Sequence, residues 1–192
     1  MRFTNLNQKS KEGFTLIELM IVVAIVGVLA VLAVYGVRKY LANAKTAEAR
    51  NSLGQLAKDA ATAVEREKGT SAYVSPGSTS ALMRAFCDTA SQVPGTATQV
   101  SGQKYQSAKG DWTTGSSTTG WQCLKFSLEE PQYYAYTYYT VSSVSAQSGG
   151  FAAQAYGDLN GDGLFSTFTV TGSAYAGAIA ISPNVQETNP EE

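Results

Sequence analysis

The segment that decides the fold reads KEGFTLIELMIVVAIVGVLAVLAVYGV, from Lys11 to Val37. Its last 24 residues, 14–37, contain a single charged side chain, Glu18. About 20 consecutive apolar residues in a helix cross the hydrocarbon core of a bilayer. Residues 14–37 are therefore predicted to form a hydrophobic transmembrane helix.

The charges in front of this segment predict its orientation. Residues 1–13 contain three basic residues and one acidic residue, a net charge of +2. By the positive-inside rule the N-terminus is cytoplasmic and the chain after residue 37 is exported. A cleaved secretory signal is disfavoured because its apolar core is shorter, about 7–15 residues. A plain signal anchor stays open, but it leaves Glu18 unexplained, since a carboxylate in hydrocarbon costs at least about 2.5 kcal/mol.

The run KEGFTLIE, from Lys11 to Glu18, and the apolar residues after it up to Ala30 closely resemble the class III signal sequence of type IV prepilins and type II secretion pseudopilins. The resemblance covers the N-terminal third of the chain. It implies that a prepilin peptidase removes the cytoplasmic leader 1–13 by cutting between Gly13 and Phe14. It also implies N-methylation of the new N-terminal residue, Phe14.

The same resemblance implies an assembly role for Glu18, which would pair with the N-terminal amine of a neighbouring subunit. Two opposite charges in a low-dielectric filament core must meet, because either one unpaired costs several kcal/mol. A carboxyl kept protonated in lipid is the alternative. One position departs from the family: Tyr35 stands where a proline is usual, which leaves open whether the helix melts near Gly27 or bends near Gly36.

Beyond the membrane the helical pattern becomes amphipathic over residues 38–68. Apolar residues recur at the spacing of one helix face, namely Leu53, Leu56, Ala57, Ala60, Ala61 and Val64. Gly69 is the predicted stop, so one helix is expected over 14–68. Its apolar stripe needs a sheet to cover it.

Residues 69–120 are predicted to be a long loop, because 25 of these 52 positions are Gly, Ser or Thr. A short helix is expected only from Ser80 to Ala90. Residues 121–192 are predicted to hold an antiparallel sheet, with strands at 121–128, 132–141, 151–156, 165–171 and 174–182. Tyr134, Tyr136 and Tyr138 are expected on one face of it. The predicted fold class is α+β, a long N-terminal helix packed on a C-terminal antiparallel sheet.

The composition argues against an enzyme. Histidine is absent, which excludes a Ser/His or Cys/His nucleophile pair and a His-ligated zinc site. No phosphate-binding loop is present. The net charge of −1 predicts no sequence-specific nucleic-acid binding, because such proteins concentrate basic residues on one surface.

The two cysteines, Cys87 and Cys123, would lie outside the cytoplasm, where disulfides persist. A bridge between them would close a loop of about 37 residues and add about 4 kcal/mol in the chain-entropy model. A reactive thiol pair is the weaker interpretation.

The run DLNGDGLFS, from Asp158 to Ser166, has the start of a calcium-binding loop. The predicted ligands are Asp158, Asn160, Asp162, the carbonyl of Leu164 and, through water, Ser166. The twelfth position is Thr169, so the usual bidentate glutamate is missing. A polar hairpin turn explains the same residues equally well. No cofactor is required, and calcium is the one candidate ligand.

What the resemblance implies about function is a structural subunit. A major pilin would polymerise with copies of itself into a type IV pilus for twitching motility, adhesion or DNA uptake. Its partners would be the prepilin peptidase and the inner-membrane assembly machinery. The precursor would lie in the inner membrane and the product in an extracellular filament. The alternatives are a type II secretion pseudopilin and a minor pilin.

Overall fold

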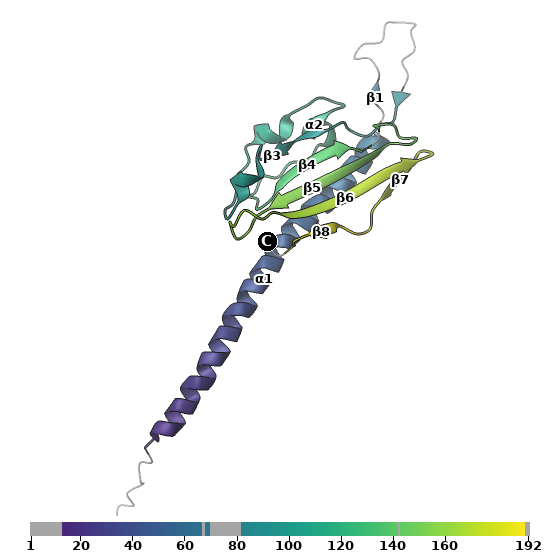
Figure 1. Ribbon diagram of the computed structural model, residues 1–192. Coiled ribbons are helices and arrows are strands. Elements are labelled where there is room, and N and C mark those ends of the chain that lie inside the picture. Colours follow the sequence, from purple (N-terminus) through teal and green to yellow (C-terminus); the bar gives the residue numbers. More distant parts are fainter. Residues whose placement is uncertain (1–12, 67, 70–81, 142, 191–192) are drawn as a thin grey trace, which may run out of the picture. The chain divides into compact units, whose positions relative to one another are not determined.

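The computed structural model describes residues 13–66, 68–69, 82–141 and 143–190. Residues 1–12 of the predicted leader 1–13, and the first two residues of the helix expected at 80–90, lie outside them. The chain divides into two compact units, residues 1–40 and 41–192. The elements, labelled in Figure 1, are α1 (Leu16–Glu65), β1 (Lys68–Gly69), β2 (Leu82–Met83), β3 (Ala90–Val93), the 3-10 helices η1 (Ala97–Val100) and η2 (Lys109–Thr113), α2 (Gly120–Leu124), β4 (Ala135–Thr140), β5 (Gly150–Gly157), β6 (Ser166–Tyr175), β7 (Ala178–Ile181) and β8 (Gln186–Thr188).

Helix α1 contains both predicted helical segments in one element of 50 residues. It is helical through Gly27 and Gly36, so neither glycine interrupts it. It ends at Glu65 rather than Lys68, and the prediction of its last turn was wrong. Lys68 and Gly69 instead pair with Met83 and Leu82 as the antiparallel strands β1 and β2.

The predicted fold class is confirmed. Strands β3 to β7 form one antiparallel sheet in the order β3-β4-β5-β6-β7, and β8 pairs with β6 beside β7. Within the unit 41–192, the later turns of α1 cover one face of this sheet, as Figure 1 shows. The sheet therefore has an inner face against α1 and an outer face away from it.

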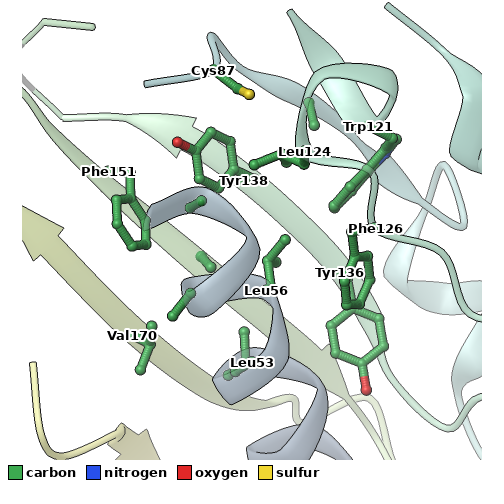
Figure 2. Close-up of a cluster of buried hydrophobic side chains, with 14 of the residues drawn as sticks. Leu53, Leu56, Cys87, Trp121, Leu124, Phe126, Tyr136, Tyr138, Phe151 and Val170 are labelled. Atoms are coloured by element: carbon green, nitrogen blue, oxygen red, sulfur yellow. The ribbon is translucent and has the colours of Figure 1, made fainter. Parts of the chain in front are cut away.

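The core lies between α1 and the inner face. Leu53 and Leu56 are fully buried among Tyr136, Tyr138 and Phe151, which Figure 2 shows together. The predicted tyrosine alternation is confirmed, since Tyr134, Tyr136 and Tyr138 are all 0% exposed. Burial raises the pKa of all three phenols, that of Tyr134 to about 12. Five of the six residues of the predicted apolar stripe are buried, Ala61 being only half-buried.

The strand predicted at 121–128 was wrong. Residues Gly120–Leu124 form the single-turn helix α2, and Lys125 caps it in the left-handed conformation, with φ 61°. The aromatic residues that suggested a strand pack edge to face instead: the rings of Trp112 and Trp121 are 4.9 Å apart and those of Trp112 and Phe126 are 5.4 Å apart. Aromatic enrichment here reflects burial in a cluster rather than strand pairing.

Two other predictions of local structure were wrong. The described residues of the expected helix 80–90 are not helical: Leu82–Met83 form β2 and Ala90 begins β3. The turn expected at 172–173 lies at Ala176 and Gly177, both with positive φ, so β6 runs on to Tyr175. A Cβ at Gly172 would collide with the ring of Phe151, and this close approach explains the glycine inside a strand. Strands β3 and β8 were not predicted.

An ion pair joins the last strand to α1. Arg50 Nε and Nη2 donate to Glu187 Oε1 and Oε2, at 2.6 and 2.9 Å, and the guanidinium lies over the ring of Phe168. The hydrogen bond from Arg50 lowers the pKa of Glu187. A carboxyl whose pKa is lowered in the folded state stabilises that state when it is ionised.

We expect Glu187→Gln to lower the free energy of unfolding by about 0.5–1 kcal/mol at pH 7, because the pair is partly exposed. The stabilisation is lost as the pH falls through the folded pKa of Glu187, so the variant and the wild type should converge well below the ordinary pKa of about 4.3. Thermal denaturation of the full chain in detergent, at pH 7 and at a pH well below about 4.3, measures the difference in stability between the variant and the wild type. The exposed Glu65→Gln is the control, and a pH-independent difference would contradict the prediction.

Candidate functional site

The predicted cleavage site lies just before α1. Gly13, Phe14 and Thr15 are not helical, and α1 begins at Leu16. Phe14 is 82% exposed. The peptide bond between Gly13 and Phe14 thus lies in exposed, non-helical chain. Cleavage there and methylation of Phe14 stay predictions.

Glu18 closes a capping box at the start of α1. The backbone N–H and the hydroxyl of Thr15 donate to Glu18 Oε2 at 2.8 and 2.7 Å, and the N–H of Glu18 donates to Thr15 Oγ1 at 3.3 Å. Sequence reasoning missed this role, although the pattern T-x-x-E signals it. The contacts hold the carboxylate beside the N-terminus of the helix, where a negative charge is favourable.

The N-terminal part of α1 exposes an apolar surface up to Leu41. Every large apolar side chain from Leu16 to Leu41 is at least half exposed, and no residue from Gly13 to Leu41 is buried. In the part of the chain that the structure describes, α1 is the one helix long and apolar enough to cross a membrane. Such a surface must be covered by lipid or by other helices.

The comparisons with known proteins bear on this segment. Residues 8–34 match the family described as the prokaryotic N-terminal methylation motif. The chain therefore carries a prepilin-type class III signal, which confirms the resemblance to type IV pilin-like proteins. That family is structural rather than enzymatic, and its signal implies processing by prepilin peptidase and fits an inner-membrane precursor.

No curated protein and no solved structure matches the chain. The evidence from sequence similarity therefore comes from the methylation motif, which covers residues 8–34 alone.

The predicted disulfide is present. Cys87 and Cys123 are bonded, with their Cα atoms 5.8 Å apart, and both are buried. The bridge joins the segment just before β3 to helix α2, whereas Cys87 was expected in the helix 80–90 and Cys123 in the strand 121–128. A hydrogen bond also joins α2 to β3: the indole N–H of Trp121 donates to the carbonyl of Ser91 at 2.8 Å.

The candidate calcium loop is closed by its own hydrogen bonds around Asp158. This buried carboxylate accepts from the Ser101 hydroxyl at 2.5 Å and from the N–H groups of Gly161 and Gly163 at 2.6 and 3.0 Å. Burial acts to raise the pKa of Asp158, but these hydrogen bonds together lower it below its usual value. These hydrogen bonds fold the loop into a turn around Asp158.

The five predicted ligands are only partly brought together. Asn160 and Asp162 are exposed neighbours, with Asn160 Nδ2 donating to Asp162 Oδ2 at 3.2 Å. Ser166 is buried and donates to the carbonyl of Gly157 at 2.8 Å. No group of three or more His, Cys, Asp or Glu side chains suited to a metal occurs in the described ranges. Calcium binding, with Leu164 supplying its carbonyl, stays a prediction.

We expect Asp158→Ala to destabilise the folded chain by about 2–3 kcal/mol, because it removes the buried carboxylate that accepts hydrogen bonds from the Ser101 hydroxyl and from the N–H groups of Gly161 and Gly163. Urea denaturation of the full chain in detergent measures the loss. The exposed Asp162→Ala is the matched control, with an expected loss below about 0.5 kcal/mol. Equal losses for the two variants would contradict the central role of Asp158.

We expect calcium to bind weakly, with a dissociation constant of about 0.1–1 mM, because the loop lacks the bidentate glutamate. Isothermal titration of the full chain in detergent should give heat that disappears in Asp162→Ala. The absence of heat and of any rise in melting temperature would show that the loop is a hairpin turn alone.

Proposed function

We propose that this protein is the major structural subunit of a type IV pilus, polymerising through α1 into an extracellular filament that serves twitching motility, adhesion or DNA uptake. The observation that supports this best is the methylation motif at residues 8–34, which leads into a helix whose large apolar side chains from Leu16 to Leu41 are all exposed. The proposal includes no catalytic role for the chain.

Cleavage after Gly13 supplies the positive charge that assembly needs. It creates a cationic amine at Phe14, and Glu18 is the only anion in the apolar segment. The amine of one subunit and the carboxylate of a neighbour then neutralise each other in the filament core. The capping contacts from Thr15 keep the carboxylate oriented toward the helix N-terminus, where that amine arrives.

The exposed apolar surface supplies the driving contacts. In the membrane it faces lipid, and in the filament it faces the same segment of other subunits. Helix association in lipid depends on close packing and polar pairing rather than on the hydrophobic effect. The single Glu18–amine pair therefore sets the register in which the apolar helices pack.

The unit 41–192 has its own core and disulfide, which suits a subunit domain outside the membrane. We therefore assign this unit to the filament body.

A pseudopilin of a type II secretion system, or a minor pilin, would carry the same N-terminal motif. Deletion of the gene in the source cells separates these functions. The major-pilin proposal predicts loss of extracellular filaments with normal protein secretion. Intact filaments together with a secretion defect would contradict it and favour the pseudopilin.

A further inference from the structure

A pocket of about 480 Å³ lies between η2, α2 and the segment that follows α2. The rings of Trp112, Trp121 and Phe126 form its floor, and each of these residues is at most 3% exposed. Concave pockets of this size, with aromatic side chains and a few polar groups, are typical of sites for small molecules. The proposed filament function gives this pocket no role.

The rim of the pocket carries charge. Lys109, Lys125 and Glu129 line it and are exposed, which gives a net charge of +1. Within the part of the chain that the structure describes, neither lysine side chain forms an ion pair or a hydrogen bond. Both ammonium groups are therefore available to a bound anion, and the net charge of the rim matches a single negative charge.

Lys125 is held in a backbone conformation that lysine disfavours. It ends α2 with φ 61° and ψ 30°, and its N–H donates to the carbonyl of Trp121 at 2.8 Å. Glycine is the usual residue at a left-handed helix end, because a Cβ is strained there. Non-glycine residues in such strained conformations cluster at ligand sites. Lysine at this position supplies the pocket with an ammonium group that glycine would not.

The walls of the pocket are fixed by contacts within the protein. The indole N–H of Trp112 donates to Ser107 Oγ at 2.8 Å, and the Ser107 hydroxyl donates to the carbonyl of Leu128 at 2.9 Å. The disulfide and the hydrogen bond from Trp121 to Ser91 hold α2. A preformed site loses less entropy when a ligand binds. Because both indole N–H groups already have acceptors, the floor offers a ligand apolar contact.

We propose that this pocket binds a small organic monoanion, an aromatic or aliphatic carboxylic acid. Its apolar body lies on the buried rings, where removal of apolar surface from water is favourable. Its carboxylate pairs with Lys109 and Lys125 through charge-assisted hydrogen bonds. A phosphate monoester fits less well, because it carries up to two negative charges and Glu129 repels the second. The inference does not depend on the filament function, since the isolated chain contains the whole pocket.

Tryptophan fluorescence measures binding at this site directly, because Trp112 and Trp121 are the only two tryptophans of the chain and both line the pocket. The probe is phenylpropionate, added to the full chain in detergent, and the neutral phenylpropanamide is the matched control probe. We expect a saturable change in emission with a dissociation constant of about 1 mM or lower. The amide should bind at least about tenfold more weakly, because it lacks the charge.

Variants of the rim separate ligand binding from folding. Lys109→Gln and Lys125→Gln should each raise the dissociation constant about fivefold or more, whereas Lys58→Gln, on an exposed part of α1, should bind like the wild type. Glu129→Gln should strengthen binding, because it removes a repelling charge. Lys125→Gly relieves the strained conformation, so it should raise the melting temperature and still weaken binding as much as Lys125→Gln. A purely structural role for Lys125 does not predict this opposition.

Three results would overturn the inference. The first is unchanged emission up to about 10 mM phenylpropionate. The second is equal binding of the acid and the amide, which would show that the pocket does not recognise charge. The third is binding that neither Lys109→Gln nor Lys125→Gln weakens, which would place the probe in the micelle or at another site. None of these results bears on filament formation, so the proposed function would be unaffected.

Discussion

Glu18→Ala is expected to abolish surface filaments while the precursor accumulates in the inner membrane at the normal level. The substitution leaves the cationic amine of Phe14 without a partner in a low-dielectric core, at a cost of several kcal/mol per subunit. Each 1.4 kcal/mol corresponds to a factor of ten in an equilibrium constant, so filament yield should fall at least about a hundredfold. Immunoblots of the sheared and membrane fractions measure both quantities.

The control Glu18→Gln separates the charge from the helix cap. Glutamine also serves in a capping box, so it keeps the contacts with Thr15 but removes the negative charge. If pairing with the amine drives assembly, Glu18→Gln fails like Glu18→Ala. Normal filaments from Glu18→Gln would show that helix capping is the essential role, and normal filaments from Glu18→Ala would contradict the assembly role altogether.

The second large effect is expected from the disulfide. Cys87→Ser with Cys123→Ser should lower the free energy of unfolding of the chain by about 4 kcal/mol in the chain-entropy model. The change also loosens α2, which the bridge and Trp121 hold near β3. Urea denaturation of the full chain in detergent measures the loss, and fewer filaments should reach the surface.

The two single variants and the reduced wild type are the controls. Each should match the double variant within about 1 kcal/mol, because any one of these changes removes the same crosslink. Two free thiols in protein from the native host, or a stability that does not change on reduction, would contradict a structural role for the bridge.

The elements that sequence reasoning predicted well are those with a strong periodic signal. The apolar run from Phe14 and the stripe through Leu53 and Leu56 fix one long helix, because both patterns persist over many turns. The alternation of Tyr134, Tyr136 and Tyr138 likewise fixed β4 and its inner face. In each case burial of one face is the physical cause of the pattern.

The predictions that failed depend on contacts distant in sequence. Trp121 and Phe126 are aromatic because they pack with Trp112 in a cluster, which neither strand propensity nor spacing reveals. Gly172 and Ser173 have the composition of a turn, yet Gly172 lies within β6 because the ring of Phe151 occupies the space of its side chain. In the candidate site, Ser101 lies 57 positions before the carboxylate that it contacts, so no local motif points to it.

Mass spectrometry of filaments sheared from the source cells tests the central claim most directly. We predict that this chain is their dominant component, that it begins at N-methylated Phe14, and that its mass is lower by two hydrogens because Cys87 and Cys123 are bonded. A chain that still begins at Met1 would contradict the account, because neither the exposed amine that Glu18 requires nor the filament built on it would then exist.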